Sequence, residues 1–382
     1  MADAPTHEPP LARYALRYAR EGLESVVLTR KPLFLTVFVT ARCGLNCGHC
    51  FYREELENGD ISSELTLDEF DRMTARMPRF PKLIITGGEP FLRGDLKDIT
   101  TLFYENASQA RQITIPTAGS HTARIVELVE EVLLPRDDLI LEIQLSIDGI
   151  GDKHDSVRGS GQWDRLMRTY RALKPIQDRN EGLRIRFNYT FSKVTEDWFE
   201  ESFDYVTREL GNPHFDMVLV RRATIDDDFA GQVDIDKYRR ATALMQGQEM
   251  RKAGGSRFKR LLAQRVQVER DIIANHHADQ RVMTGCTAGT LTAIVGETGE
   301  LRPCEILDTS FGNLRDVDFD FAALWNGGVA DAHRKFVKDT GCFCTFETCV
   351  RTTMSFQPKW YGHMAANYVS DRLRARRSGG DG

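Results

Sequence analysis

Three cysteines lie close together in one short segment, Cys-Gly-Leu-Asn-Cys-Gly-His-Cys, which runs from Cys43 through Cys47 to Cys50. Three thiolates gathered on one loop can wrap around a single [4Fe–4S] cluster. Three protein ligands leave one iron of such a cluster open, and an open iron can chelate a small molecule and pass an electron into it. A zinc site is the alternative, although zinc normally takes four protein ligands, often in paired C-x2-C spacing.

The other five cysteines form a second group near the end of the chain, at Cys286, Cys304, Cys342, Cys344 and Cys349. Residues 1–10 are polar and lack the basic and then apolar pattern of a secretory signal. We therefore expect a cytoplasmic protein in a reducing compartment, where clustered cysteines bind metal or do redox work. These five cysteines lie among glycine, proline and polar residues, which does not fit ordinary hydrophobic packing.

The composition is that of an ordered globular protein, because 41% of the 382 residues are hydrophobic and 28% are charged. This length predicts one large domain and a smaller one. The 51 lysines and arginines face 56 aspartates and glutamates, so no basic excess indicates a nucleic-acid partner. The apolar run at 33–39 is far too short to cross a bilayer as a helix.

Apolar runs rich in β-branched residues alternate with helical patterns over much of the chain. They cover residues 33–40, 82–86, 112–116, 139–147, 183–191 and 214–220. This alternation predicts parallel strands with crossover helices, and the simplest such fold is an α/β, partial (β/α)6 TIM-like barrel. Thr66 and Glu69 form a capping box, which predicts a helix after the first cysteines and places those cysteines in a strand-to-helix loop. The carboxyl end of the strands is where a barrel assembles its active site.

The chain divides into five predicted parts. These are an N-terminal helical extension at 1–32, the barrel at 33–232, a helical connection at 233–282, a cysteine-rich module at 283–350 and a C-terminal tail at 351–382. Within the extension, residues 11–28 place an apolar face opposite Arg13, Arg17, Arg20 and Glu24. Such a face can pack on the core, and a basic amphipathic helix can also lie on an anionic membrane surface.

The C-x3-C-x2-C spacing after a first strand resembles the signature of the radical S-adenosylmethionine (radical SAM) superfamily. The second predicted strand ends in Gly87-Gly88-Glu89-Pro90, which is similar to the G-G-E-P motif that binds the amino group of the methionine moiety in that family. Glycines let the backbone approach a ligand, and the Glu89 carboxylate can accept hydrogen bonds from an ammonium group.

The segment after the fourth predicted strand supports the same resemblance. Ser146-Ile147-Asp148-Gly149 is similar to the ribose-contacting segment of the family. Arg158 follows in the same loop and resembles the arginine that pairs with the methionine carboxylate in relatives, a task that suits a planar guanidinium.

The resemblance implies several further contacts with the cofactor. His49, beside the third cysteine, occupies a position near the adenine in relatives. Asn188 or Thr190 on the fifth strand, and the backbone near Val220 on the sixth, would flank the adenosine. Thr117 ends the third strand in Thr-Ala-Gly, where many relatives carry Thr-Asn-Gly.

Cys286 and Cys304, with a glycine between them, resemble the start of the SPASM/Twitch auxiliary-cluster domain. A full SPASM domain has enough further cysteines for two clusters, whereas only Cys342, Cys344 and Cys349 follow here. The resemblance therefore implies a truncated, Twitch/SPASM-like module with one auxiliary [4Fe–4S] cluster. Its ligands would be Cys286, Cys304 and Cys349 with either Cys342 or Cys344, and a structural zinc is the alternative.

The resemblance implies that the reduced cluster cleaves S-adenosylmethionine to a 5′-deoxyadenosyl radical, which abstracts hydrogen from a substrate. A reductant such as flavodoxin or ferredoxin would supply the electron, and the auxiliary cluster would accept an electron from the substrate or relay one. Because only about thirty residues precede the first strand, where many peptide-modifying relatives carry a leader-recognition domain, a small-molecule or lipid-like substrate is favoured. The alternatives are a ribosomal peptide whose leader is read by a separate protein, and a non-catalytic iron–sulfur scaffold or sensor.

Overall fold

The structure is a computed structural model, and it describes residues 31–107, 112–212, 214–221, 233–279 and 283–378, together with Arg20, Leu23 and Glu24. Apart from those three residues, the amphipathic segment predicted at 11–28 lies outside the described residues. None of the described helices has the length and apolarity needed to cross a membrane.

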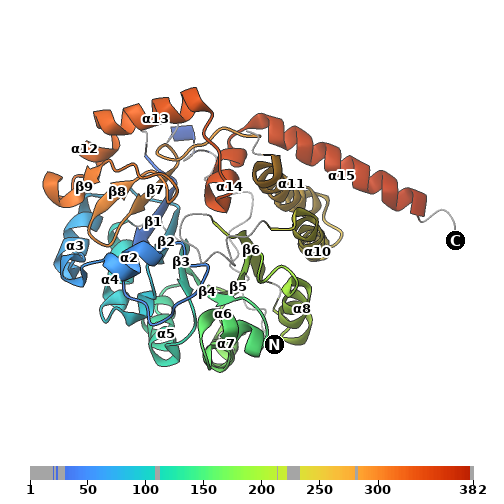
Figure 1. The fold of residues 1–382 in the computed structure, drawn as a ribbon, viewed down its shortest axis with the longest axis horizontal. Helices are drawn as coiled ribbons and strands as arrows, with labels where there is room; N and C mark the ends of the chain where they lie inside the picture. The colour runs from blue at the N-terminus through green and yellow to red at the C-terminus, as the bar shows by residue number, and fades with distance from the viewer. Residues whose placement is uncertain are drawn as a thin grey trace.

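Nine strands form one sheet in the order β6-β5-β4-β3-β2-β1-β7-β8-β9 (Figure 1). The barrel strands are β1 (Phe34–Phe38), β2 (Lys82–Thr86), β3 (Gln112–Thr117), β4 (Ile140–Ile147), β5 (Leu183–Phe191) and β6 (Phe215–Leu219). Each of these strands runs parallel to its neighbours in the barrel. They coincide with the six runs predicted from the sequence, so the partial (β/α)6 barrel is confirmed.

Alternation along each strand decides which side chains face the surrounding helices. In β5, Tyr189 and Phe191 are fully buried, and their ring centroids lie 5.4 and 5.9 Å from that of Phe199 on a flanking helix. Arg186 and Asn188 alternate with these aromatic residues and therefore point to the inside of the barrel. The strand thus has an apolar outer face and a polar inner face.

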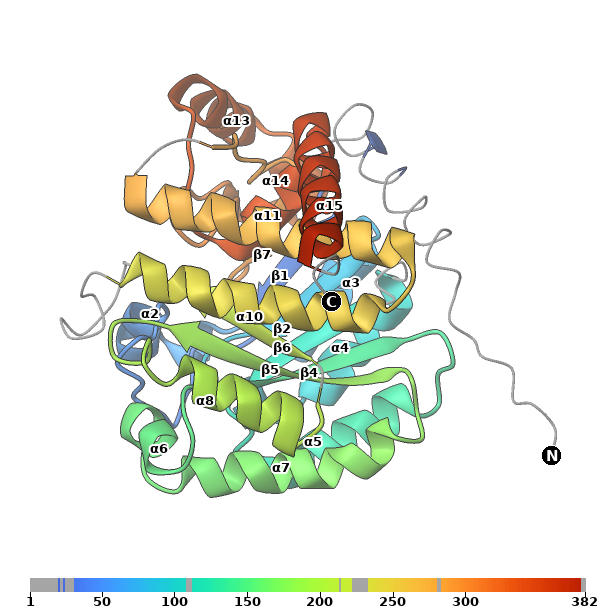
Figure 2. The same cartoon turned by 90° about the vertical axis from the view of Figure 1, so that its right-hand side faces the viewer.

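Helices cover the outer face of the barrel. They are α3 (Leu67–Arg76), α4 (Leu96–Asn106), α5 (Thr122–Leu128), α7 (Gln162–Gln177) and α8 (Phe199–Asp204). The predicted capping box is present on α3, where Thr66 Oγ1 accepts from Glu69 N at 3.3 Å and the Thr66 N–H donates to Glu69 Oε2 at 2.9 Å. Figure 2 shows α10 (Ile235–Ala253) and α11 (Arg257–Asp279) on the other side of the sheet from α5, α7 and α8.

The C-terminal quarter of the chain joins the barrel through its sheet. Its described elements are β7 (Thr292–Val295), β8 (Glu300–Arg302), β9 (Gly312–Asn313), α12 (Phe321–Trp325), α13 (Gly328–Thr340), α14 (Glu347–Ser355) and α15 (Pro358–Ser378). Strand β7 pairs parallel with β1, with Phe34 opposite Thr292, and β8 and β9 extend the sheet antiparallel. The strands of the cysteine-rich module predicted at 283–350 thus continue the sheet of the barrel.

A side-chain clamp also fixes this module to the barrel. Arg315 Nε donates to Glu69 Oε1 at 2.7 Å, and its Nη1 donates to Ser63 O at 2.8 Å. The N–H of Leu65 donates to Glu297 O at 2.7 Å. Glu69 therefore caps α3 and holds the C-terminal module at the same time.

Paired, buried charged side chains lie on the inside of the barrel beside β6. Arg270 of α11 is 1% exposed, pairs with Asp216 and donates to Met217 O. Arg351 of α14 lies 2.8 Å from Glu269 Oε1 and 3.6 Å from Asp216 Oδ2. Buried charges are tolerated only when they are paired in this way. Helices α11 and α14 thus fill the inside of the barrel beside β6, which pairs only with β5 among the described residues.

Candidate functional site

The first cysteine group lies in the loop between β1 and α2 (Arg53–Asn58). Cys47 is buried, and the N–H of Cys50 donates to Cys47 O at 3.0 Å. Burial raises the pKa of the Cys43 thiol to about 11, and the charges of Glu89, Cys47 and Cys50 act in the same direction. Thiolates at this position therefore need nearby cations, which the irons of a cluster would supply.

Two buried side chains brace the start of this cysteine loop. Glu64 Oε1 accepts from Thr40 Oγ1 at 2.6 Å and from the Ala41 N–H at 2.9 Å. Arg93 Nη1 donates to Val39 O at 2.7 Å. Sequence reasoning missed both residues, because neither belongs to a recognised motif. Their contacts connect two later loops to the end of β1.

The loop after β2 lies directly against the cysteine loop. Gly88 N donates to Thr40 O at 2.9 Å and Glu89 N donates to Arg42 O at 2.8 Å. A Cβ atom at Gly87 would lie 2.4 Å from Thr40 O, and one at Gly88 would lie 2.3 Å from Arg42 O. Both glycines are therefore required by the close approach of the two backbones.

The Glu89 side chain is 3% exposed and connects the loop after β2 to the end of β3. Its Oε1 accepts from Thr117 Oγ1 at 2.8 Å and from the Phe91 N–H at 3.2 Å, and its Oε2 accepts from the Ala118 N–H at 2.9 Å. Pro90 opens the short 3-10 turn that follows. Thr117, a predicted cofactor residue, thus holds Glu89. A carboxylate has about four acceptor positions, so about one is left for a ligand.

A second buried group lies at the end of β4. Asp148 is fully buried, and its Oδ2 lies 2.6 Å from Arg158 Nε and 3.6 Å from His49 Nε2. Its Oδ1 accepts from the Thr190 N–H at 3.1 Å, and its own N–H donates to His154 Nδ1 at 3.2 Å. Burial lowers the pKa of His49 to about 4, so the imidazole near Asp148 is neutral. The sequence analysis assigned Asp148 and Arg158 to different parts of the cofactor, and the structure pairs them with each other.

Arg158 connects this group electrostatically to the two loops described above. Burial raises the pKa of the Cys47 thiol, and the positive charge of Arg158 opposes that rise. Burial likewise raises the pKa of Glu89, whereas its hydrogen bonds and the positive charge of Arg158 lower it. The cysteine loop, Glu89 and the Asp148–Arg158 pair therefore share one site at the carboxyl ends of β1, β2 and β4.

The remaining predicted cofactor residues lie on neighbouring strands. Ser146 of β4 is opposite Asn188 of β5 in the register of the sheet. Asn188 Oδ1 is buried and has no hydrogen-bond partner among the described residues. The N–H of Val220 already donates to Phe191 O at 2.9 Å, which leaves only its carbonyl for a ligand. The orphaned oxygen of Asn188 is an acceptor that a bound molecule could satisfy.

The second cysteine group also comes together in space. Cys304 and Cys349 are buried in one small cluster, and Cys286 and Cys344 pack against them. A hydrogen bond with Cys286 raises the pKa of the Cys342 thiol, so Cys342 lies beside this cluster. The structure thus brings together five cysteines that are spread over more than sixty positions of the sequence.

In the ranges that the structure describes, no three His, Cys, Asp or Glu side chains are grouped so as to hold one metal ion.

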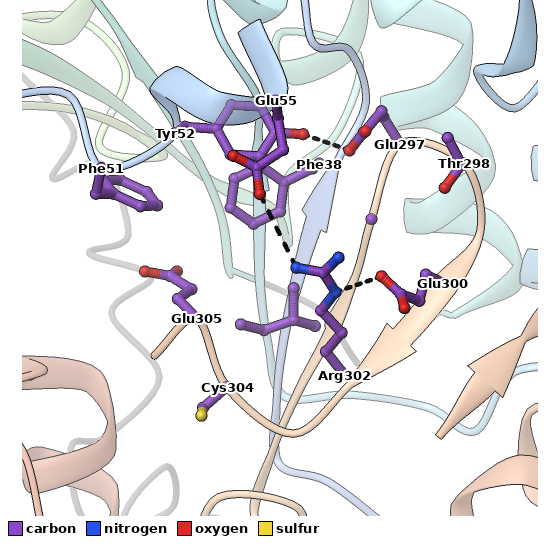
Figure 3. A pocket seen from close by; sticks show the side chains of 12 residues that line it. Phe38, Phe51, Tyr52, Glu55, Glu297, Thr298, Glu300, Arg302, Cys304 and Glu305 are labelled. Carbon is purple, nitrogen blue, oxygen red and sulfur yellow. Dashed lines mark hydrogen bonds and ion pairs between the residues drawn. The ribbon is translucent and has the colours of Figure 1, made fainter. Parts of the chain in front are cut away.

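A recess separates the first cysteine loop from the β7–β8 hairpin. It encloses about 490 Å³ of empty space, part of it open to solvent. Figure 3 shows Phe38 and Phe51 on the side of the cysteine loop, and Arg302, Cys304 and Glu305 on the side of the hairpin. The recess therefore borders both cysteine groups.

Comparison with known sequences matches residues 37–206 to the Radical SAM superfamily. The AdoMet-dependent heme synthase of Methanosarcina barkeri is 26% identical over 320 residues, which is 81% of this chain and 86% of that protein. The AdoMet-dependent heme synthase of Nitratidesulfovibrio vulgaris is 24% identical and covers 74% of this chain and 76% of its own length.

Solved structures share the fold over most of the chain. Streptococcus suis SuiB bound to its precursor peptide SuiA has a TM-score of 0.58 at 16% identity, covering 88% of this chain and 75% of SuiB. The structure of anSMEcpe with bound AdoMet also has a TM-score of 0.58, at 15% identity, and covers 90% of this chain and 99% of that chain. At these identities the likeness concerns the fold alone.

Proposed function

We propose that this chain, which is a member of the radical SAM superfamily and an enzyme, abstracts hydrogen from a small-molecule substrate and uses an auxiliary cluster to oxidise it or form a bond. The observation that carries the proposal is the single site formed by the cysteine loop, the loop at Gly87 to Pro90 and the Asp148–Arg158 pair. A non-catalytic scaffold would need the three thiols but not the buried groups around them.

The cofactor site that we propose uses this chain's own donors and acceptors. Cys43, Cys47 and Cys50 would hold a [4Fe–4S] cluster, which would supply the electron for the cleavage of S-adenosylmethionine. The remaining acceptor position of Glu89 would receive the ammonium of the methionine moiety. The Arg158 guanidinium, held by Asp148 through Nε, would offer its other N–H groups to the carboxylate.

The adenosine would lie along the inner face of β4 and β5. Ser146 and the orphaned Asn188 Oδ1 would bond its hydroxyl or amino groups. The neutral His49 ring beside Asp148 would border the same space. Val220 would contribute its backbone carbonyl, whereas the Thr190 N–H holds Asp148 in place.

For the auxiliary [4Fe–4S] cluster we propose Cys286, Cys304, Cys344 and Cys349 as ligands. These four pack together, whereas Cys342 lies outside that packed cluster and hydrogen-bonds with Cys286. A cluster takes at most four thiolates, so one of the five cysteines has another role. Figure 3 places Cys304 on the recess that also borders the first cysteine loop.

A small molecule is the substrate class that these observations favour. Aromatic, carboxylate and arginine side chains line the recess, and these can contact a small molecule that carries polar groups. The heme synthases to which the chain is similar are named for a small-molecule product. A peptide with a separately bound leader is the second candidate, and the likeness to SuiB in fold does not by itself favour it.

Anaerobic product analysis tests the proposed chemistry. Reconstituted protein reduced with dithionite is expected to convert S-adenosylmethionine to 5′-deoxyadenosine, because the cluster's open iron would lie beside Glu89 and Arg158. The matched control is the same protein without dithionite. A colourless protein that contains zinc and releases no deoxyadenosine would contradict the proposal.

Substitution of Arg158 tests the cofactor assignment. Arg158→Ala is expected to weaken S-adenosylmethionine binding about tenfold or more, equivalent to about 1.4 kcal/mol, because a buried carboxylate ligand loses its cation. Iron content should change little, since Arg158 is not a proposed iron ligand. Binding is measured by calorimetry together with iron analysis and thermal stability.

Arg168, which is exposed on α7, provides the matched control, and Arg168→Ala should bind the cofactor normally. Arg158→Lys should recover part of the lost affinity, because it restores the charge but not the planar fork. Loss of iron in Arg158→Ala at unchanged cofactor affinity would count against the assignment.

A further inference from the structure

Arg221, the second residue after β6, lies between the two cysteine groups. Its Cζ atom is 5.0 Å from the ring centroid of Phe51 and 4.0 Å from that of Phe346. Phe51 directly follows Cys50, and Phe346 is two residues after Cys344. One guanidinium thus contacts an aromatic side chain from each cysteine group.

Two carboxylates complete the surroundings of this guanidinium. Arg221 Nη1 pairs with Glu305, which directly follows Cys304, and Nη2 lies 3.8 Å from Glu347 Oε2. The side chains of Arg221, Glu305 and Glu347 are 13%, 9% and 6% exposed. Glu347 Oε1 accepts from the Leu219 N–H at 2.8 Å, which anchors α14 to β6. The charge of Arg221 therefore acts inside the protein, where water screens it little.

Each cysteine group has one buried arginine of its own. Arg158 pairs with Asp148, which lies 3.6 Å from His49 of the first cysteine loop. Arg221 instead pairs with Glu305, which directly follows Cys304 of the second group. Arg158 thus lies at the first cysteine group and Arg221 beside the second.

We infer that Arg221 sets the reduction potential of the auxiliary cluster by placing a buried positive charge beside it. The inference rests on the proposed function, because it requires an iron–sulfur cluster on Cys286, Cys304, Cys344 and Cys349. Reduction adds one negative charge to the cluster, so a fixed cation stabilises the reduced form and raises the potential. A higher potential makes the cluster a better acceptor for an electron from the substrate. Arg221 is a positioning residue here and does not itself bind iron.

The test is a potentiometric titration of the loaded enzyme followed by electron paramagnetic resonance. The paramagnetic resonance signal that does not change when S-adenosylmethionine is added is assigned to the auxiliary cluster, because only the first cluster is proposed to bind the cofactor. Arg221→Gln is expected to lower the one-electron reduction equilibrium constant of this cluster at least tenfold, which corresponds to about 59 mV. Arg221→Lys keeps the charge and should shift the potential less. Glu305→Gln removes a negative charge and should shift it in the opposite direction.

Arg302 provides the matched control, because it lies at the end of β8, two residues before Cys304, but its side chain is 39% exposed and pairs with Glu300. Arg302→Gln should leave the potential nearly unchanged, since solvent screens its charge. An unchanged or raised potential in Arg221→Gln, at full iron content, would overturn the inference and leave the proposed function intact. Absence of a second cluster signal in the wild-type protein would overturn both.

Discussion

Replacing Cys43, Cys47 and Cys50 together by alanine is expected to abolish formation of 5′-deoxyadenosine and to leave about half of the iron. The reason is that the protein should hold about eight irons in two four-iron clusters, only one of which loses its ligands. The second group is bound by a different part of the chain, in which Cys304 and Cys349 are buried. Iron analysis, visible absorption and product analysis under anaerobic conditions measure the result.

The matched control for this variant replaces a cysteine outside both proposed ligand sets. Cys342→Ala should keep all the iron and the full yield of deoxyadenosine. If the triple variant retains no iron, the two-cluster proposal fails, even though the radical chemistry can still be correct. If it keeps all its iron and still forms deoxyadenosine, the assignment of the first cluster fails.

Replacing Cys286 and Cys304 by alanine is expected to remove the other half of the iron and to lower the thermal stability of the C-terminal module. A metal-bound module loses part of its folding free energy with its ligands. Because β7 and β8 lie between these two cysteines in the sequence and β7 pairs with β1, the damage can spread to the barrel sheet. Iron content and thermal unfolding by circular dichroism are the measurements.

Single substitutions of Cys342 and Cys344 test which of the two is the fourth ligand of the auxiliary cluster. Cys344→Ala should lose the auxiliary cluster, whereas Cys342→Ala should keep it, because Cys344 packs with the other three proposed ligands. The two substitutions are chemically identical and lie two positions apart in the sequence. The reverse result would assign the fourth ligand to Cys342 and would correct the proposed set.

The barrel could be predicted from sequence because its physical basis is local. The alternation of Tyr189 and Phe191 with Arg186 and Asn188 identifies a strand and its two faces without knowledge of its neighbours. The helix at Thr66 could be located for the same reason, because a capping box involves residues only three positions apart. The cysteine groups were visible because thiols at close spacing are rare outside metal sites.

The contacts that hold the site together could not be predicted, because they depend on the folded chain. Nothing in the sequence around Glu64 or Arg93 shows that they reach the backbone at the end of β1. The Asp148–Arg158 pair was missed because a family motif assigns a role to each residue separately and says nothing of their contact. Glu89 likewise accepts from three groups within the protein before any ligand binds.

The pairing of β7 with β1 has a consequence for biosynthesis. The chain emerges from the ribosome with β1 first, yet that strand cannot form its ladder with β7 until residues 292–295 have been made. Contacts between such distant segments form slowly, and an exposed strand edge invites association with other chains. The cysteine loop directly follows β1. If iron bound to this loop during translation, it would bind before β7 had paired with β1. Expression at low temperature, with iron supplied after translation, should therefore give a larger fraction of correctly assembled protein.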